Sequence, residues 1–209
     1  MDAIVGSRVS HPKIRIDTFG LPRMVPGRIG GALNLDGSNE FASLGKQQEA
    51  CLGNLDLCRH GLLLSAWLRP GQLKDGMDVM SSGSNGLRIW YEGGKLKVSA
   101  RTSTKEWNLE TDRVRLDQWQ FVEVAWHPED GLRFYVNEEQ VAESTRSTVR
   151  ADPGVSNPDR EQFYFGRGDG TRSNARYGNF SLDDVEYWSS NRDYLMAFDY
   201  IQRGTTSAS

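Results

Sequence analysis

The chain has 209 residues, a hydrophobic fraction of 37% and a formal net charge of −3. A chain of this length can bury a sizeable core as one large domain, without metals or many disulfides. The charge excludes a global basic field of the kind that binds nucleic acid, and no apolar run approaches the roughly 20 residues that a membrane-spanning helix needs.

Alternation between polar and apolar residues predicts β-strands along most of the chain. Six Trp, seven Tyr and eight Phe with 22 Gly are typical of many strands joined by tight turns. In chain order, the twelve predicted strands cover residues 13–19, 31–37, 40–45, 62–70, 78–83, 87–92, 95–101, 120–127, 132–137, 140–146, 162–166 and 179–188. Only residues 192–204 have a helical pattern. We therefore predict an all-β fold, a two-sheet antiparallel sandwich of the jelly-roll type, with a short C-terminal helix.

Two predicted hairpins can be placed in register. Gly93-Gly94 has the composition of a two-residue primed turn, so Trp90 should face Lys97. One face of this hairpin is apolar, with Leu87, Ile89, Tyr91, Leu96, Val98 and Ala100; the other carries Arg88, Trp90, Glu92, Lys95, Lys97 and Ser99. The second hairpin buries Val122, Val124, Trp126, Leu132, Phe134 and Val136. Because antiparallel sheets commonly have one solvated face, we expect the polar face of both hairpins to be exposed.

The two cysteines, Cys51 and Cys58, lie close together in the sequence. The residues between them include Gly53 and Asn54 and can loop back to close a small disulfide ring; two free thiols are the alternative. We expect the disulfide, which indicates a compartment outside the cytosol. Residues 1–13 do not have the pattern of a signal peptide, so the chain is either cytosolic or a piece of a larger secreted protein. The expected disulfide favours the second alternative.

Several segments follow one another in a familiar order: GRIGGALNLDGSNEFASLG at 27–45, LLLSAWLRP at 62–70, DQWQFVEVAWHPEDGLRFYVNEEQVAES at 117–144, FYFGRGDG at 163–170 and FSLDDVEYW at 180–188. Together they resemble laminin-G-like jelly-roll domains of the concanavalin A-like fold, a group that includes thrombospondin N-terminal and pentraxin domains. The resemblance spans about residues 27 to 202. The pair Cys51 and Cys58 resembles a subset found in ectodomains of adhesion and receptor proteins.

The resemblance implies an extracellular binding module that recognises a protein or an acidic glycan, sometimes through calcium, within an adhesion or receptor protein. A calcium-dependent lectin and a purely structural domain are the alternatives. We assign residues 1–26 to a lead-in with one edge strand, 27–202 to the sandwich and 203–209 to a disordered tail. Asn179-Phe180-Ser181 is a glycosylation sequon, which fits an extracellular surface.

Glycoside hydrolases of the same fold place a Glu-x-Asp-x-Glu motif on one strand, so that alternate carboxylates enter the cleft. The nearest match here is Leu182-Asp183-Asp184-Val185-Glu186, in which the nucleophile position holds a leucine. A leucine cannot attack an anomeric carbon. We therefore expect no enzymatic activity, and we expect Asp183 and Asp184 to accept hydrogen bonds from loop backbone.

The first candidate ligand site is the polar face of the first hairpin, with Arg88, Trp90, Lys95, Lys97 and, beyond them, Arg101. An exposed tryptophan ringed by cations can stack on a sugar and neutralise its sulfates or carboxylates, and Lys97 opposite Trp90 can form a cation–π contact. The alternative is a solvated sheet face whose charges serve solubility alone.

Two loops are further candidates. Asp36, Asn39 and Glu40 form an oxygen-rich turn, and Asp169 and Asn174 add further oxygens, so calcium is a possible ligand; the alternative is an Asx turn that closes on its own backbone. Arg167-Gly168-Asp169 is the tripeptide that integrins recognise, and its alternative is a turn that ends a strand.

Overall fold

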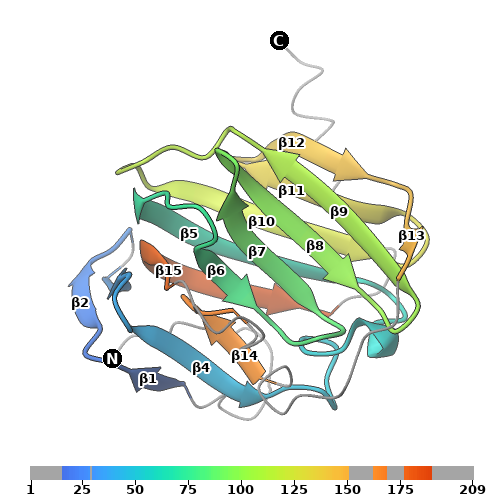
Figure 1. Cartoon of the computed structure of the whole chain (residues 1–209), viewed down its shortest axis with the longest axis horizontal. Coiled ribbons are helices and arrows are strands. Elements are labelled where there is room, and N and C mark those ends of the chain that lie inside the picture. The colour runs from blue at the N-terminus through green and yellow to red at the C-terminus, as the bar shows by residue number, and fades with distance from the viewer. Residues whose placement is uncertain (1–15, 29, 151–161, 169–176, 190–209) are drawn as a thin grey trace.

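The computed structural model describes residues 16–28, 30–150, 162–168 and 177–189. Its strands form two antiparallel sheets that pack face to face (Figure 1). The eight-stranded sheet has the order β1-β4-β14-β6-β7-β8-β9-β13, and the seven-stranded sheet has the order β12-β11-β10-β5-β15-β3-β2. Within the described ranges, no helix is long and apolar enough to cross a membrane.

The strands of the eight-stranded sheet are β1 (Asp17–Phe19), β4 (Phe41–Lys46), β6 (Asp78–Ser81), β7 (Leu87–Glu92), β8 (Lys95–Arg101), β9 (Lys105–Thr111), β13 (Thr148–Val149) and β14 (Gln162–Phe165). Those of the seven-stranded sheet are β2 (Arg23–Pro26), β3 (Gly31–Asp36), β5 (Leu62–Gln72), β10 (Gln120–His127), β11 (Gly131–Val136), β12 (Glu139–Ser144) and β15 (Asn179–Trp188). A single 3-10 turn, η1 (Leu55–Leu57), completes the elements of the described residues.

Each of the twelve predicted strands has a counterpart, which confirms the all-β sandwich. Three strands, β2, β9 and β13, were not predicted from the sequence. Two of the missed strands, β2 and β13, lie at sheet edges, whereas β9 lies between β8 and β13. The residues of the predicted C-terminal helix, 192–204, and of the predicted tail, 203–209, lie outside the described ranges.

The first hairpin has the predicted register, with Trp90 opposite Lys97 and Glu92 opposite Lys95. Gly93 and Gly94 both have positive φ, 63° and 79°, as a primed two-residue turn requires. The second hairpin buries the six predicted apolar side chains. Local turn chemistry and period-two alternation therefore sufficed to place these strands.

The core lies between the two sheets and is rich in aromatic rings. Trp126 on β10 and Trp107 on β9 meet edge to face, with ring centroids 5.4 Å apart and planes at 77°. These two strands belong to different sheets, so the contact between the rings packs one sheet against the other. Such a pair adds about 0.5–1.5 kcal/mol to what burial of the rings contributes.

Cys51 and Cys58 form the predicted disulfide. The ring encloses η1, whose N-cap Asn54 accepts a hydrogen bond from the Asp56 N–H at 3.1 Å. The Asp56 carboxylate in turn accepts the Ser103 N–H at 2.9 Å, between β8 and β9. The disulfide ring is therefore anchored to the eight-stranded sheet beside the candidate hairpin surface.

Replacing Cys51 and Cys58 together by alanine is expected to lower the free energy of unfolding by about 2 kcal/mol, the modest loss of a short closed loop. Urea unfolding followed by tryptophan fluorescence measures the change. Dithiothreitol should lower the midpoint of the wild type by a similar amount and leave that of the double variant unchanged. An unchanged wild-type midpoint after verified reduction would contradict the prediction.

Candidate functional site

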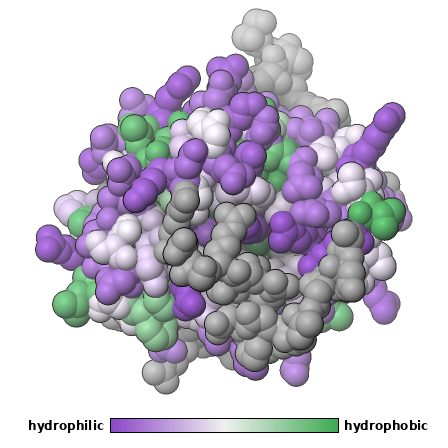
Figure 2. All heavy atoms as spheres, in the orientation of Figure 1, coloured by the Kyte–Doolittle hydropathy of each residue, from purple (hydrophilic) through white to green (hydrophobic). Residues whose placement is uncertain are grey.

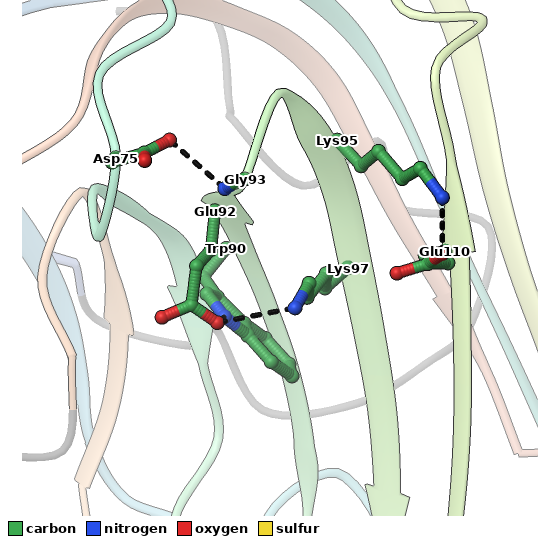
Figure 3. Close-up of polar contacts among 7 residues, drawn as sticks. All are labelled: Asp75, Trp90, Glu92, Gly93, Lys95, Lys97 and Glu110. Carbon is green, nitrogen blue, oxygen red and sulfur yellow. Dashed lines mark hydrogen bonds and ion pairs between the residues drawn. The ribbon is translucent and has the colours of Figure 1, made fainter.

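The polar face of β7, β8 and β9 holds the hairpin residues singled out above (Figure 3). In register, Trp90 lies between Asp78 on β6 and Lys97 on β8, and Lys97 lies beside Glu110 on β9. Asp75, in the loop before β6, accepts the Gly93 N–H at 3.0 Å and so holds the end of the hairpin (Figure 3). The hairpin is thus hydrogen-bonded to β6 on one side and to β9 on the other, and Asp75 holds its turn.

Arg88 was predicted to be exposed, but its side chain is buried. It is 9% exposed, and its guanidinium binds the Asp78 carboxylate through Nη2 at 2.6 Å and Nε at 2.7 Å. Ser99, predicted on the same exposed face, is fully buried. Both predictions were wrong because the hairpin lies inside an eight-stranded sheet, where β6 and β9 supply neighbours on either side.

Trp90 is partly buried and contacts a different cation from the one predicted. The Arg88 guanidinium lies 4.8 Å from the centroid of the Trp90 ring. Lys97 instead binds Glu92, with Nζ and Oε2 3.2 Å apart (Figure 3). The same Glu92 oxygen lies 3.4 Å from the Trp90 indole nitrogen, which donates to it weakly.

The remaining predicted cations also have carboxylate partners. Lys95 binds Glu110 (Figure 3), and Arg101 binds Glu106 through Nε at 2.7 Å. The hydrogen bond with Glu110 raises the pKa of Lys95, and the bond with Lys95 lowers the pKa of Glu110. Each of the four predicted cations is therefore compensated, and this surface does not present an excess of positive charge to a polyanion.

Of the four carboxylates that make this compensation, only Glu92 was placed on this face from the sequence. Glu106 and Glu110 lie on the unpredicted strand β9, and Asp78 begins β6. The signal for β9 was present, because Trp107, Leu109 and Thr111 alternate with polar residues and are buried. A strand predicted there would have placed its glutamates beside the lysines of β8.

Gly166 separates the Arg-Gly-Asp tripeptide from β14, and the arginine of the tripeptide packs on the protein. The Arg167 guanidinium lies 5.1 Å from the ring centroid of Phe41 and 5.0 Å from that of Tyr164. A Cβ on Gly168 would lie 2.4 Å from Asp78 Oδ2, so any larger residue there would have to displace the Asp78 carboxylate. This packing favours a strand-ending turn over an integrin ligand. Asp169 lies outside the described residues.

The oxygen-rich turn after β3 closes on its own backbone. Asp36 Oδ1 accepts the Ser38 N–H at 2.8 Å, and Glu40 Oε2 accepts the Asp36 N–H at 2.8 Å. Asn39 is exposed. In the part of the chain that the structure describes, no group of three or more His, Cys, Asp or Glu side chains is arranged to hold a metal ion. Asp169 and Asn174, the other predicted ligands, lie outside that part.

The carboxylates of β15 do not form the motif of a hydrolase. Leu182 is in the core, and the register of β15 against β5 shifts between Asp183 and Glu186. Asp183 accepts the backbone N–H groups of Arg28 at 2.7 Å and Asp184 at 3.0 Å. The expected backbone hydrogen bonds are therefore confirmed for Asp183.

A buried carboxyl lies on the outward face of the seven-stranded sheet. Glu123 on β10 is 2% exposed, although its neighbours Val122 and Val124 point to the core. Its Oε2 has no hydrogen-bond partner. Burial, with a smaller contribution from the Glu138 carboxylate, raises the pKa of Glu123 to about 7. The expectation that this face is fully solvated was therefore wrong at Glu123.

The predicted glycosylation site begins β15. Asn179 is half-buried, and its Nδ2 donates to the Asp36 carbonyl at 2.9 Å. Whether a glycan is attached there stays a prediction.

The molecular face drawn in Figure 2 is predominantly hydrophilic, with hydrophobic residues scattered over it. Large exposed apolar side chains in the described residues are Phe19, Leu21, Met24, Leu57, Leu116 and Val149.

Residues 44–193 match the model of the Laminin_G_3 family, which is described as the concanavalin A-like lectin/glucanases superfamily. No curated protein matches the sequence.

Three solved structures with the same fold are informative. The receptor-binding domain of botulinum neurotoxin C/D mosaic serotype is 14% identical, with a TM-score of 0.58 over 88% of this chain and 46% of that chain. The binding domain of botulinum neurotoxin DC in complex with SialylT is 10% identical, with a TM-score of 0.59 over 89% and 46%. Domain 4 of AbnA, an extracellular arabinanase of family GH43 from Geobacillus stearothermophilus, in complex with arabinotriose, is 14% identical, with a TM-score of 0.55 over 82% and 81%. The chain thus spans about half the length of the neurotoxin domains, and at these identities the likeness concerns the fold alone.

Proposed function

Because the chain belongs to the concanavalin A-like lectin/glucanases superfamily, we propose that it is a non-catalytic extracellular module that recognises carbohydrate within a larger adhesion or receptor protein. The disulfide between Cys51 and Cys58 supports the extracellular setting. The AbnA domain supports the ligand class, because the chain spans 81% of a domain that was solved in complex with arabinotriose.

The observation that carries the proposal is the half-buried Trp90 ring in a surface of paired charges. An aromatic ring beside a few fixed donors and acceptors is the usual composition of a small-ligand site. Lys97 and Glu92 offer a donor and an acceptor next to the ring. Because the cations already have carboxylate partners, the surface suits a sugar of low charge better than a heavily sulfated glycan.

The absence of catalysis is part of the proposal. In a comparison with the Glu-x-Asp-x-Glu pattern, the buried Leu182 stands at the position of the nucleophilic glutamate, and the Asp183 carboxylate accepts two backbone N–H groups. We expect no new reducing ends after prolonged incubation with the oligosaccharides that the protein binds.

A glycan array with neutral, carboxylated and sulfated members tests the proposal. We expect retention of glycans of low charge, and elution from heparin at low salt. Trp90→Ala should weaken neutral-glycan binding about tenfold or more, since truncating a central aromatic contact of a binding site typically costs more than about 1 kcal/mol. Trp90→Phe, which keeps a ring, is the matched control and should retain most of the affinity. Tight heparin binding with no neutral ligand would refute this reading of the surface.

A further inference from the structure

Arg167 differs from the half-buried Arg101 and Arg133, which bind carboxylates, and from the half-buried Arg150, whose Nη1 donates to Asn85 Oδ1 and the Thr102 carbonyl. Arg101 and Arg133 each bind a glutamate, at 2.7 Å and 2.8 Å respectively. Within the described ranges, no carboxylate pairs with Arg167. Its Nε is buried and has no hydrogen-bond acceptor. A guanidinium whose Nε is buried without an acceptor, and which has no carboxylate partner among the described residues, is suited to bind an anionic group.

Aromatic rings hold this guanidinium in place. Phe41 on β4 and Tyr164 on β14 meet edge to face, with centroids 5.6 Å apart and planes at 82°, and the guanidinium lies about 5 Å from both. Phe19 on β1 stacks on Phe41 at 4.5 Å, and Phe19 is 45% exposed. The ring cluster therefore runs from beneath Arg167 to the surface at the edge of the eight-stranded sheet.

This environment determines which kind of ligand Arg167 can bind. With Nε enclosed, the two Nη groups remain to meet a ligand, and their parallel N–H bonds match the two oxygens of a carboxylate. The neighbouring rings restrict the side chain, so less conformational freedom is lost on binding than for an exposed arginine. A single cation of this kind selects one carboxylate and not a polyanion.

We propose that Arg167, held by Phe41 and Tyr164, is the binding site for the carboxylate of an acidic sugar. This inference rests on the proposed function, because it names the charged group of the carbohydrate ligand. It assigns to the arginine of the Arg-Gly-Asp tripeptide a role in ligand binding that does not involve an integrin. It also places a second contact on the same sheet as Trp90, since β14 and β7 both pair with β6.

Two matched probes test the proposal: methyl galacturonide and methyl galactoside, which differ at C6 by a carboxylate in place of a hydroxymethyl group. Affinities are measured by ligand-observed NMR titration on the full chain. We expect the wild type to bind the galacturonide at least tenfold more tightly, with the preference falling as salt is added. Arg167→Gln should abolish the preference, and Arg167→Lys should retain only part of it because lysine lacks the planar fork.

Arg59→Gln, which changes an exposed arginine directly after Cys58, is the matched control and should keep the full preference. Equal affinity of the wild type for both probes would overturn the inference while leaving carbohydrate recognition intact. A preference that survives Arg167→Gln in a variant with an unchanged melting temperature would overturn it as well. If neither probe nor any member of the glycan array binds, the proposed function itself fails.

Discussion

Asp78→Ala is expected to destabilise the domain by about 3–5 kcal/mol, because the change leaves the Arg88 guanidinium buried without its carboxylate. The side chains of Arg88 and Asp78 are 11% and 6% exposed, and Nη2 and Oδ1 are 2.6 Å apart. An uncompensated charge in such a position costs far more than the pair contributes when intact. Urea unfolding at pH 7, with the midpoint and the slope fitted separately, measures the loss.

Lys97→Ala is the matched control, because it breaks an ion pair on the same sheet whose side chains are 30% and 44% exposed. Exposed pairs contribute at most about 1 kcal/mol, so this variant should unfold near the wild-type midpoint. Replacing both buried charges, Asp78→Leu with Arg88→Met, should recover most of the loss, since no orphaned charge remains. Equal losses of unfolding free energy for Asp78→Ala and Lys97→Ala would show that breaking the buried pair costs no more than breaking an exposed pair.

The stability of the domain is expected to fall as pH rises from about 5 to about 8, because of Glu123. Burial raises the pKa of Glu123 from an ordinary value of 4.5 to about 7. A carboxyl with a raised folded-state pKa binds its proton more tightly in the native state. Its contribution is therefore fully present below pH 4.5 and is lost as pH rises through about 7. The whole effect is about 3 kcal/mol.

Glu123→Gln separates this carboxyl from all others that titrate in the same range. The variant should match the wild type at pH 4.5 and be more stable by up to about 3 kcal/mol at pH 8, because its amide remains uncharged. Glu139→Gln, an exposed glutamate on β12, is the control and should follow the wild-type profile. Urea midpoints from pH 4.5 to pH 8 give the three curves. Parallel curves for the wild type and Glu123→Gln would contradict the assignment.

Local features of the sequence determined much of the fold. The hairpin at Gly93-Gly94 has its predicted register because two consecutive glycines favour one turn type, and period-two alternation then decides which side chains face the core. The same reasoning located the disulfide, because Cys51 and Cys58 need only a local loop to meet. It would also have located β9, where Trp107 and Leu109 alternate with polar residues.

The character of the surface was decided by contacts between strands that are distant in sequence. Arg88 is buried because β6 brings Asp78 beside it, and Lys95 is compensated because β9 brings Glu110 beside it. Arg167 packs on Phe41, a residue of a strand near the other end of the described chain. Alternation assigns each of these side chains to the outward face but says nothing of what lies next to it. The neighbours of a strand are set by the strand order of its sheet, which depends on the packing of the whole sandwich. Only the tertiary structure therefore decided the charge compensation, the burial of Glu123 and the aromatic surroundings of Arg167.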